Sequence, residues 1–128
     1  SFNKSHILNH NFQARHKEEW APVEEVEIES ISLKCKTLRQ LFEEYGVSFI
    51  ECLRVDTEGH DFEILKTLNS TDVRPREIIF ERKHMDGTFN CGARYEELVG
   101  FLHQLKYSVK ILNEENSIAT LSGPPKHP

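Results

Sequence analysis

The sequence predicts an α/β fold built on a mostly parallel sheet that ends in an antiparallel hairpin. Two observations lead to this prediction. Short apolar segments with strand character alternate with segments of helical periodicity from about residue 26 to residue 105. Two further strand-like segments, 107–112 and 117–121, are separated only by a short polar turn. Alternating strands and helices favour a parallel sheet covered by helices, and a short polar turn favours a hairpin.

The first part of the chain is expected to contain an arm and one strand. Residues 1–25 show no periodicity, which is typical of an irregular arm or loop. Apolar and polar residues then alternate over 26–35, the pattern of a half-buried strand. The phase of this alternation slips by one residue near Ser30, which suggests a bulge or a bend.

A short helix is predicted over residues 38–45. Thr37 and Gln40 have the spacing of a capping box, in which each side chain binds the main chain of the other residue. Leucine and aromatic residues follow at helical spacing. Gly46 suits the end of this helix, because glycine tolerates the left-handed backbone conformation.

The next segment, 49–55, is short, mostly apolar and bounded by turn residues, which predicts a central strand of a parallel sheet. Cys52 lies within it and is expected to be a small buried apolar residue. The polar residues 56–59 end the strand, and helical spacing resumes over 62–69.

The last third of the chain completes the alternation. A strand is predicted over 77–81, after Pro75 has marked a connection. A loop over 82–92 then leads to an amphipathic helix over 94–105. After the hairpin, residues 122–128 contain three prolines and are expected to be a disordered tail.

Composition excludes several classes of function. The 128 residues are 38% hydrophobic and carry a net charge of −5, so neither nucleic acid nor a membrane surface is an expected partner. The three cysteines form no C-x-x-C pair, which argues against a structural zinc site, and no metal is expected. Unpaired cysteines and a polar start predict a cytoplasmic location.

Candidate chemistry lies where two predicted strands end. In open α/β sheets, ligands bind outside the carboxyl ends of the strands. Asp56 and Glu58 follow the strand at 49–55, and Glu81 ends the strand at 77–81. If these strands are neighbours, the three carboxylates converge on one rim. Gly59 would let the backbone turn sharply there.

Several roles are open to these side chains. A carboxylate at the rim can accept a proton or hold a substrate in line, and His60 and His84 are further candidate proton acceptors. Two carboxylates can instead hold a divalent cation. The structural alternatives are that Glu58 only caps the next helix, and that Glu81 only pairs with a neighbouring arginine, Arg54 or Arg82.

The stretch from Leu53 to Lys66, LRVDTEGHDFEILK, resembles the signature of the FkbM-type methyltransferases. In that pattern an apolar strand with a basic residue precedes Asp-x-Glu-Gly-x-acid, an apolar pair and often Lys. The Thr-Leu step at Thr37 and the later strand ending in Glu81 are also similar, and the resemblance covers roughly 25–112. The departures are that Arg39 stands in place of Asp, Asp61 in place of Glu, and Thr67 in place of Gly.

This resemblance implies a class I, Rossmann-like methyltransferase fold, a three-layer sandwich of which residues 26–121 would form the C-terminal half. It implies S-adenosylmethionine as the methyl donor and a sugar, polyketide or similar small hydroxyl compound as the acceptor. The implied catalytic residues are Asp56, Glu58 and Glu81. Asp56 and Gly59 would contact the cofactor, and His60 and His84 the substrate.

The glycine-rich turn with which such domains cradle the cofactor has no counterpart, since the chain contains no Gly-x-Gly and no glycine before Gly46. We therefore expect a fragment whose cofactor-binding strands lie upstream and whose exposed sheet edge favours a homodimer. Two alternatives stay open. One is a small metal-dependent hydrolase using Asp56 and Glu58, and the other is a non-catalytic interaction domain on the same scaffold.

Overall fold

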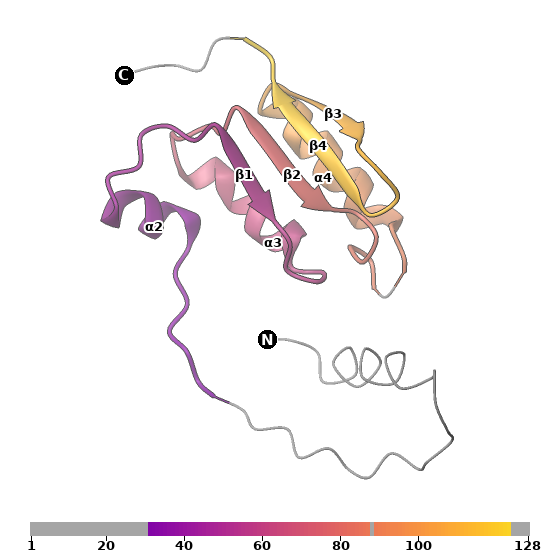
Figure 1. Ribbon diagram of the computed structural model, residues 1–128, viewed down its shortest axis with the longest axis horizontal. Helices are drawn as coiled ribbons and strands as arrows, with labels where there is room; N and C mark the ends of the chain where they lie inside the picture. Colours follow the sequence, from indigo (N-terminus) through magenta and orange to yellow (C-terminus); the bar gives the residue numbers. More distant parts are fainter. Residues whose placement is uncertain (1–30, 88, 124–128) are drawn as a thin grey trace. The chain divides into compact units, whose positions relative to one another are not determined.

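The computed structural model describes residues 31–87 and 89–123 (Figure 1). The chain divides into two units, Ser1–Cys35 and Lys36–Pro128, and every described helix and strand belongs to the second. In chain order these elements are α2 (Leu38–Glu44), β1 (Cys52–Val55), α3 (Asp61–Lys66), the 3-10 helix η1 (Thr67–Ser70), β2 (Glu77–Glu81), α4 (Gly92–Gln104), β3 (Tyr107–Ile111) and β4 (Asn116–Leu121).

The four described strands form one mixed sheet in the order β1-β2-β4-β3. β1 and β2 are parallel, with Val55 opposite Phe80, whereas β4 is antiparallel to both of its neighbours. The terminal hairpin of β3 and β4 is thus confirmed. The mostly parallel sheet is not, because only one of the three described strand pairs is parallel. Within the described residues β1 also lies at an edge of the sheet and not at its centre.

Helices α3 and α4 lie behind the same face of the sheet in Figure 1. The described part therefore has two layers, where three were expected. Alternate residues of each strand face these helices and form the core with helical leucines. The residues that contribute most are Val55, Ile78, Phe80 and Ala119 from the sheet, and Leu65, Leu68, Leu98 and Leu102 from the helices. Full burial of each large side chain stabilises the fold by about 1.5–3 kcal/mol.

Cys52 is exposed, so the prediction that it is buried is wrong. Successive side chains of a strand point to opposite faces, and Val55 points to the core. Cys52 and Arg54 therefore share the face that lies away from the helices, and both are exposed.

The predicted helix over 38–45 is confirmed as α2. The Thr37 side chain accepts a hydrogen bond from the Gln40 main chain, and the Gln40 side chain accepts one from the Thr37 main chain at 2.9 Å. Gly46 follows with a φ of 60°, in the left-handed region. Arg39 forms an ion pair with Glu43 one turn later, at 2.7 Å, on the helix surface.

The strand predicted over 26–35 is wrong for residues 31–35, which form no strand. Ile31 and Leu33 are 79% and 76% exposed, so their alternation with polar residues buries no apolar surface. Residues 26–30 lie outside the described part of the chain, as do the predicted arm at 1–25 and residues 124–128 of the predicted tail.

The remaining elements follow the sequence with small shifts. The helix expected over 62–69 is α3 followed by the 3-10 turn η1, and the helix expected over 94–105 starts two residues early as α4. Asp86 lies before α4, and its carboxylate accepts the main-chain N–H of Arg94 at 2.7 Å. Across residues 31–87 and 89–123, no helix has the length and apolar character needed to cross a membrane.

Candidate active site

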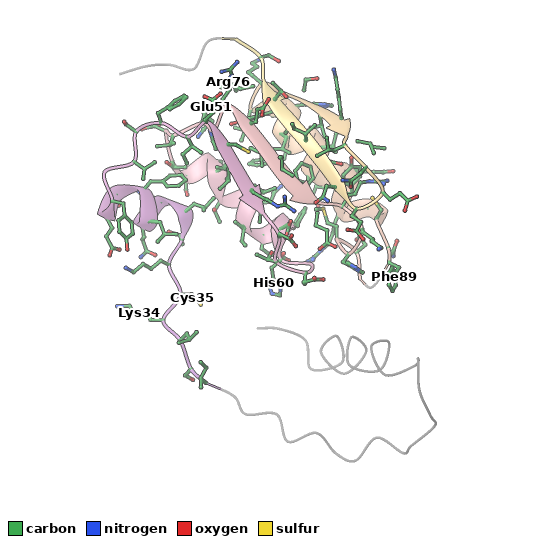
Figure 2. All side chains as sticks on the ribbon, in the orientation of Figure 1. Lys34, Cys35, Glu51, His60, Arg76 and Phe89 are labelled. Carbon is green, nitrogen blue, oxygen red and sulfur yellow. The ribbon has the colours of Figure 1, made fainter. Side chains whose placement is uncertain are left out.

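The loops that follow β1 and β2 leave the sheet at the same end. Because the two strands are parallel and adjacent, which was the condition of the rim hypothesis, the acidic residues after Val55 and Phe80 share one rim. His60 and Phe89 lie at this end in Figure 2, whereas the ion pair of Glu51 and Arg76 lies at the opposite end.

A buried carboxylate, Asp61, joins the two loops. It is 1% exposed, although it belongs to the first turn of α3. One of its oxygens accepts the main-chain N–H of Thr57 at 2.9 Å and the Thr57 hydroxyl at 2.5 Å. The other accepts the main-chain N–H of Glu81 at 2.8 Å. Asp61 therefore holds the end of β2 against the turn that follows β1.

The turn itself is tightly bent. Glu58 and Gly59 have φ angles of 52° and 100°. A Cβ atom on Gly59 would lie 3.2 Å from the main-chain oxygen of His84, so glycine permits the close approach of the loop that follows β2. Glu58 is not the N-cap residue of α3, because that residue is His60, whose side chain makes no capping hydrogen bond.

Glu81 is the most deeply buried of the three candidate catalytic acids, at 9% exposure. Its Oε2 atom is buried and has no hydrogen-bond partner among the described residues. Burial raises the pKa of Glu81 to about 7, helped by the nearby negative charges of Glu58, Asp61 and Asp56. Near neutral pH this carboxyl group is therefore poised between its protonated and ionised forms.

The arginines proposed as alternative partners of Glu81 have other contacts. Arg54 lies 3.6 Å from the Asp56 carboxylate, which is 53% exposed. Arg82 donates from its guanidinium to the main-chain oxygen of Glu114 at 3.2 Å, and it lies over the ring of Tyr95. Within the described part of the chain, Glu81 forms no ion pair with either arginine, and its charged neighbours are other acids and His84.

The two candidate histidines differ in position. His60 is exposed on the turn after β1. The Nε2 atom of His84 lies 3.5 Å from Oε1 of Glu81, and both side chains are only 10% exposed. The main-chain N–H of Phe89 donates to Nδ1 of His84 at 2.9 Å, and the two rings meet edge to face. The structure therefore brings His84, and not His60, to the buried acid.

Glu58, Glu81 and His84 have the spacing of a metal site, since one ligand atom from each lies within 4.8 Å of the others. The histidine tautomer argues against this use. Nδ1 accepts a hydrogen bond, so the proton of a neutral ring is on Nε2, and a protonated nitrogen cannot coordinate a metal. Asp56, which the hydrolase alternative requires, is not in this group.

One family model matches the chain. The model of the methyltransferase FkbM domain matches residues 2–109 of the 128. No curated protein and no solved structure matches the chain. The matched range includes the turn after β1, the buried Asp61 and Glu81 at the end of β2. The chain belongs to the FkbM methyltransferase domain family.

Proposed function

We propose that this chain forms the acceptor side of an S-adenosylmethionine-dependent O-methyltransferase and that Glu81 removes the proton of the acceptor. The proposed acceptor is a small hydroxyl compound such as a sugar or a polyketide. The observation that carries the proposal is the buried Oε2 atom of Glu81, which has no hydrogen-bond partner among the described residues at the rim. A buried acceptor atom without a partner is costly, so its presence favours a functional explanation.

The chemistry requires one proton to be removed. S-adenosylmethionine supplies a methyl group on positively charged sulfur. Methylation of the acceptor oxygen would break the sulfur–methyl bond and release a neutral thioether. The hydroxyl proton then has to go to a base, and Oε2 of Glu81 receives it. A pKa of about 7 suits this role, because general bases act best when their pKa lies near the working pH.

The negative charge of the rim also suits the positively charged sulfonium of the cofactor. Asp56 and Glu58 are exposed carboxylates on the same turn, and negative charge there attracts a sulfonium. Gly59 keeps the main chain of this turn close to the loop after β2. The chain has no Gly-x-Gly turn to cradle the rest of the cofactor. Cofactor binding therefore has to be measured on a longer form as well.

The binding test is isothermal titration of S-adenosylhomocysteine. It is carried out on this chain and on the longest open reading frame that contains it. We expect micromolar binding to the long form. No binding to either form would contradict the proposal and favour a non-catalytic interaction domain on the same scaffold.

The catalytic test follows transfer of a labelled methyl group to panels of sugars and polyketides. We expect Glu81→Gln to lower kcat by about 100-fold or more. Glu77→Gln is the matched control, because Glu77 lies on the same strand at the end away from the rim. Equal activity of the two variants would contradict the role of Glu81.

A further inference from the structure

The proposed base has two oxygens in different surroundings. Oε1 of Glu81 faces Nε2 of His84 at 3.5 Å, whereas Oε2 has no hydrogen-bond partner among the described residues. Both side chains are 10% exposed, so water has little access to either. The two oxygens therefore differ in their contacts because of His84, and that difference depends on the contacts that hold the imidazole ring in place.

The loop after β2 fixes that ring. The main-chain N–H of Phe89 donates to Nδ1 of His84, and the edge of one ring meets the face of the other with centroids 4.9 Å apart. Phe89 has a φ of 58°, an uncommon value for a residue with a side chain. The turn that holds it contains hydrogen bonds from Gly87 to His84 and from Asn90 to Gly87, at 3.2 and 3.1 Å.

The direction of the Phe89 hydrogen bond decides the tautomer. Nδ1 accepts the bond, so it carries no proton, and the ring proton is on Nε2. Nε2 is the nitrogen that faces Glu81. The distance of 3.5 Å is long for a hydrogen bond, and such contacts between catalytic groups often tighten only when a substrate is bound.

We propose that His84 is a positioning residue, which holds Oε1 of Glu81 with its Nε2–H and leaves Oε2 as the oxygen that receives the acceptor's proton. This inference rests on the proposed function, because it assumes that Glu81 is the base. It assigns His84 a role through Glu81 and not through direct contact with the substrate. It also explains why the loop accepts the uncommon backbone conformation of Phe89, since the N–H of that residue sets the tautomer.

Two variants separate the donor from the bulk of the side chain. His84→Gln keeps an N–H donor near the position of Nε2, and His84→Leu keeps the volume without the donor. His103→Leu, on the exposed surface of α4, is the control. The first measurement is nitrogen NMR of the histidine rings in the full 128-residue chain. We expect the proton of His84 on Nε2, and a proton on Nδ1 would overturn the proposal.

The second measurement is a pH titration of Glu81, followed through the carbon signal of its labelled carboxyl group. A donor to the ionised form lowers the pKa of a carboxyl, so we expect the midpoint to rise by at least about half a pH unit in His84→Leu. It should stay near the wild-type value in His84→Gln. The other charges that face Glu81 are Glu58, Asp61, Asp56 and Glu115, and they are the same in all variants.

Two results would contradict the pairing of His84 with Glu81. An unchanged midpoint in His84→Leu, relative to His103→Leu, would overturn the proposal. So would manganese that selectively broadens the signals of Glu58, Glu81 and His84, because coordination needs an unprotonated Nε2. If His84→Leu does not fold, the tautomer of His84 in the wild type and the titration of Glu81 in His84→Gln still test the pairing of His84 with Glu81.

Methyl transfer is measured separately. We expect His84→Leu to lower kcat about tenfold with little change in KM for the acceptor, and His84→Gln to restore most of the activity. A wild-type long form that transfers no methyl group, but shows the expected tautomer and titration, would refute the proposed function and leave the pairing of His84 with Glu81 intact. An active protein in which the titration midpoint of Glu81 is unchanged by His84→Leu would refute only the pairing of His84 with Glu81.

Discussion

The carboxylate of Asp61 accepts the main-chain N–H of Glu81 at 2.8 Å, across a separation of 20 residues. The same carboxylate binds Thr57 with its other oxygen, so it connects the two loops of the candidate site. Its burial shows that it positions the rim, whereas the exposed Asp56 and Glu58 remain accessible to a ligand.

Replacing Asp61 should therefore loosen the site and destabilise the fold. Asp61→Ala leaves two main-chain donors, those of Thr57 and Glu81, without their acceptor. We expect a loss of about 3 kcal/mol in the free energy of unfolding, measured by urea denaturation. Glu63→Ala in the same helix is the control, and its exposed carboxylate should cost less than about 1 kcal/mol. Similar losses in both variants would contradict this role of Asp61.

Two replacements of glycine by alanine should change the stability of the fold in opposite directions. Gly59→Ala places a Cβ atom 3.2 Å from the main-chain oxygen of His84 at a φ of 100°, so we expect a loss of about 1–3 kcal/mol. Gly100→Ala lies in α4 with nothing within 4 Å, and alanine favours the helix. That variant should gain about 0.5–1 kcal/mol. Thermal unfolding of both variants checks the pair, and a stable Gly59→Ala would contradict the close approach of the two loops.

The raised pKa of Glu81 predicts a specific dependence of stability on pH. With a pKa of about 7 in the folded state and 4.5 as the ordinary value, the folded chain binds more protons between these limits. The contribution of Glu81 to stability therefore falls as the pH rises from 4.5 to 7, and it is flat above.

In Glu81→Gln this loss of stability is absent, so the stability of the variant relative to the wild type should increase between pH 5 and pH 8, by about 1–2 kcal/mol once solvent screening is allowed for. Urea denaturation at a series of pH values, in the presence of a chelator, measures the difference. Glu77→Gln, the control on the same strand, should show no such trend. A flat difference for Glu81→Gln would mean that the pKa of Glu81 is near its ordinary value.

A hydrogen bond from Tyr107 connects the terminal hairpin to the rest of the sheet. The buried hydroxyl of Tyr107 donates to the main-chain oxygen of Pro75 at 2.6 Å, which ties β3 to the segment before β2. Tyr107→Phe should cost about 1 kcal/mol at neutral pH, measured by chemical denaturation. Tyr45→Phe, at a side chain that is 72% exposed, should be neutral.

Burial of the Tyr107 hydroxyl should also make the stability of the fold depend on pH above pH 10. Burial raises the pKa of Tyr107 to about 12, so the unfolded chain loses this proton first as the pH rises above 10. The wild type should therefore lose stability between pH 10 and pH 12, and Tyr107→Phe should lack that part of the loss. An identical pH dependence of the two proteins would contradict the burial of this hydroxyl.

Elements that depend on residues close in the chain could be predicted from the sequence. Helix α2 begins at Thr37 because the capping box involves only residues within one turn. The hairpin forms across a turn in which the Asn113 side chain accepts the main-chain N–H groups of Glu115 and Asn116. The adjacency of β1 and β2 was a condition of the rim hypothesis and not a prediction, and the parallel pairing of the two strands meets it.

Predictions that needed a distant partner were less successful. The alternation over 31–35 has the period of a strand, but a strand forms only where another strand pairs with it, and none of the described strands does. Cys52 was expected to be buried because its neighbours are apolar, yet its face of β1 is exposed. Periodicity shows that a segment can have two faces, but it does not show which face is covered.

The sequence by itself determined the family signature, the order of most elements and the three acids of the rim. Only the tertiary structure decided which of these acids is buried, that Asp61 links the loops, and that His84 and not His60 meets Glu81. The physical reason is that desolvation and the hydrogen bonds of a carboxylate depend on groups far away in the chain. Composition and spacing carry no information about which of those groups the fold brings together.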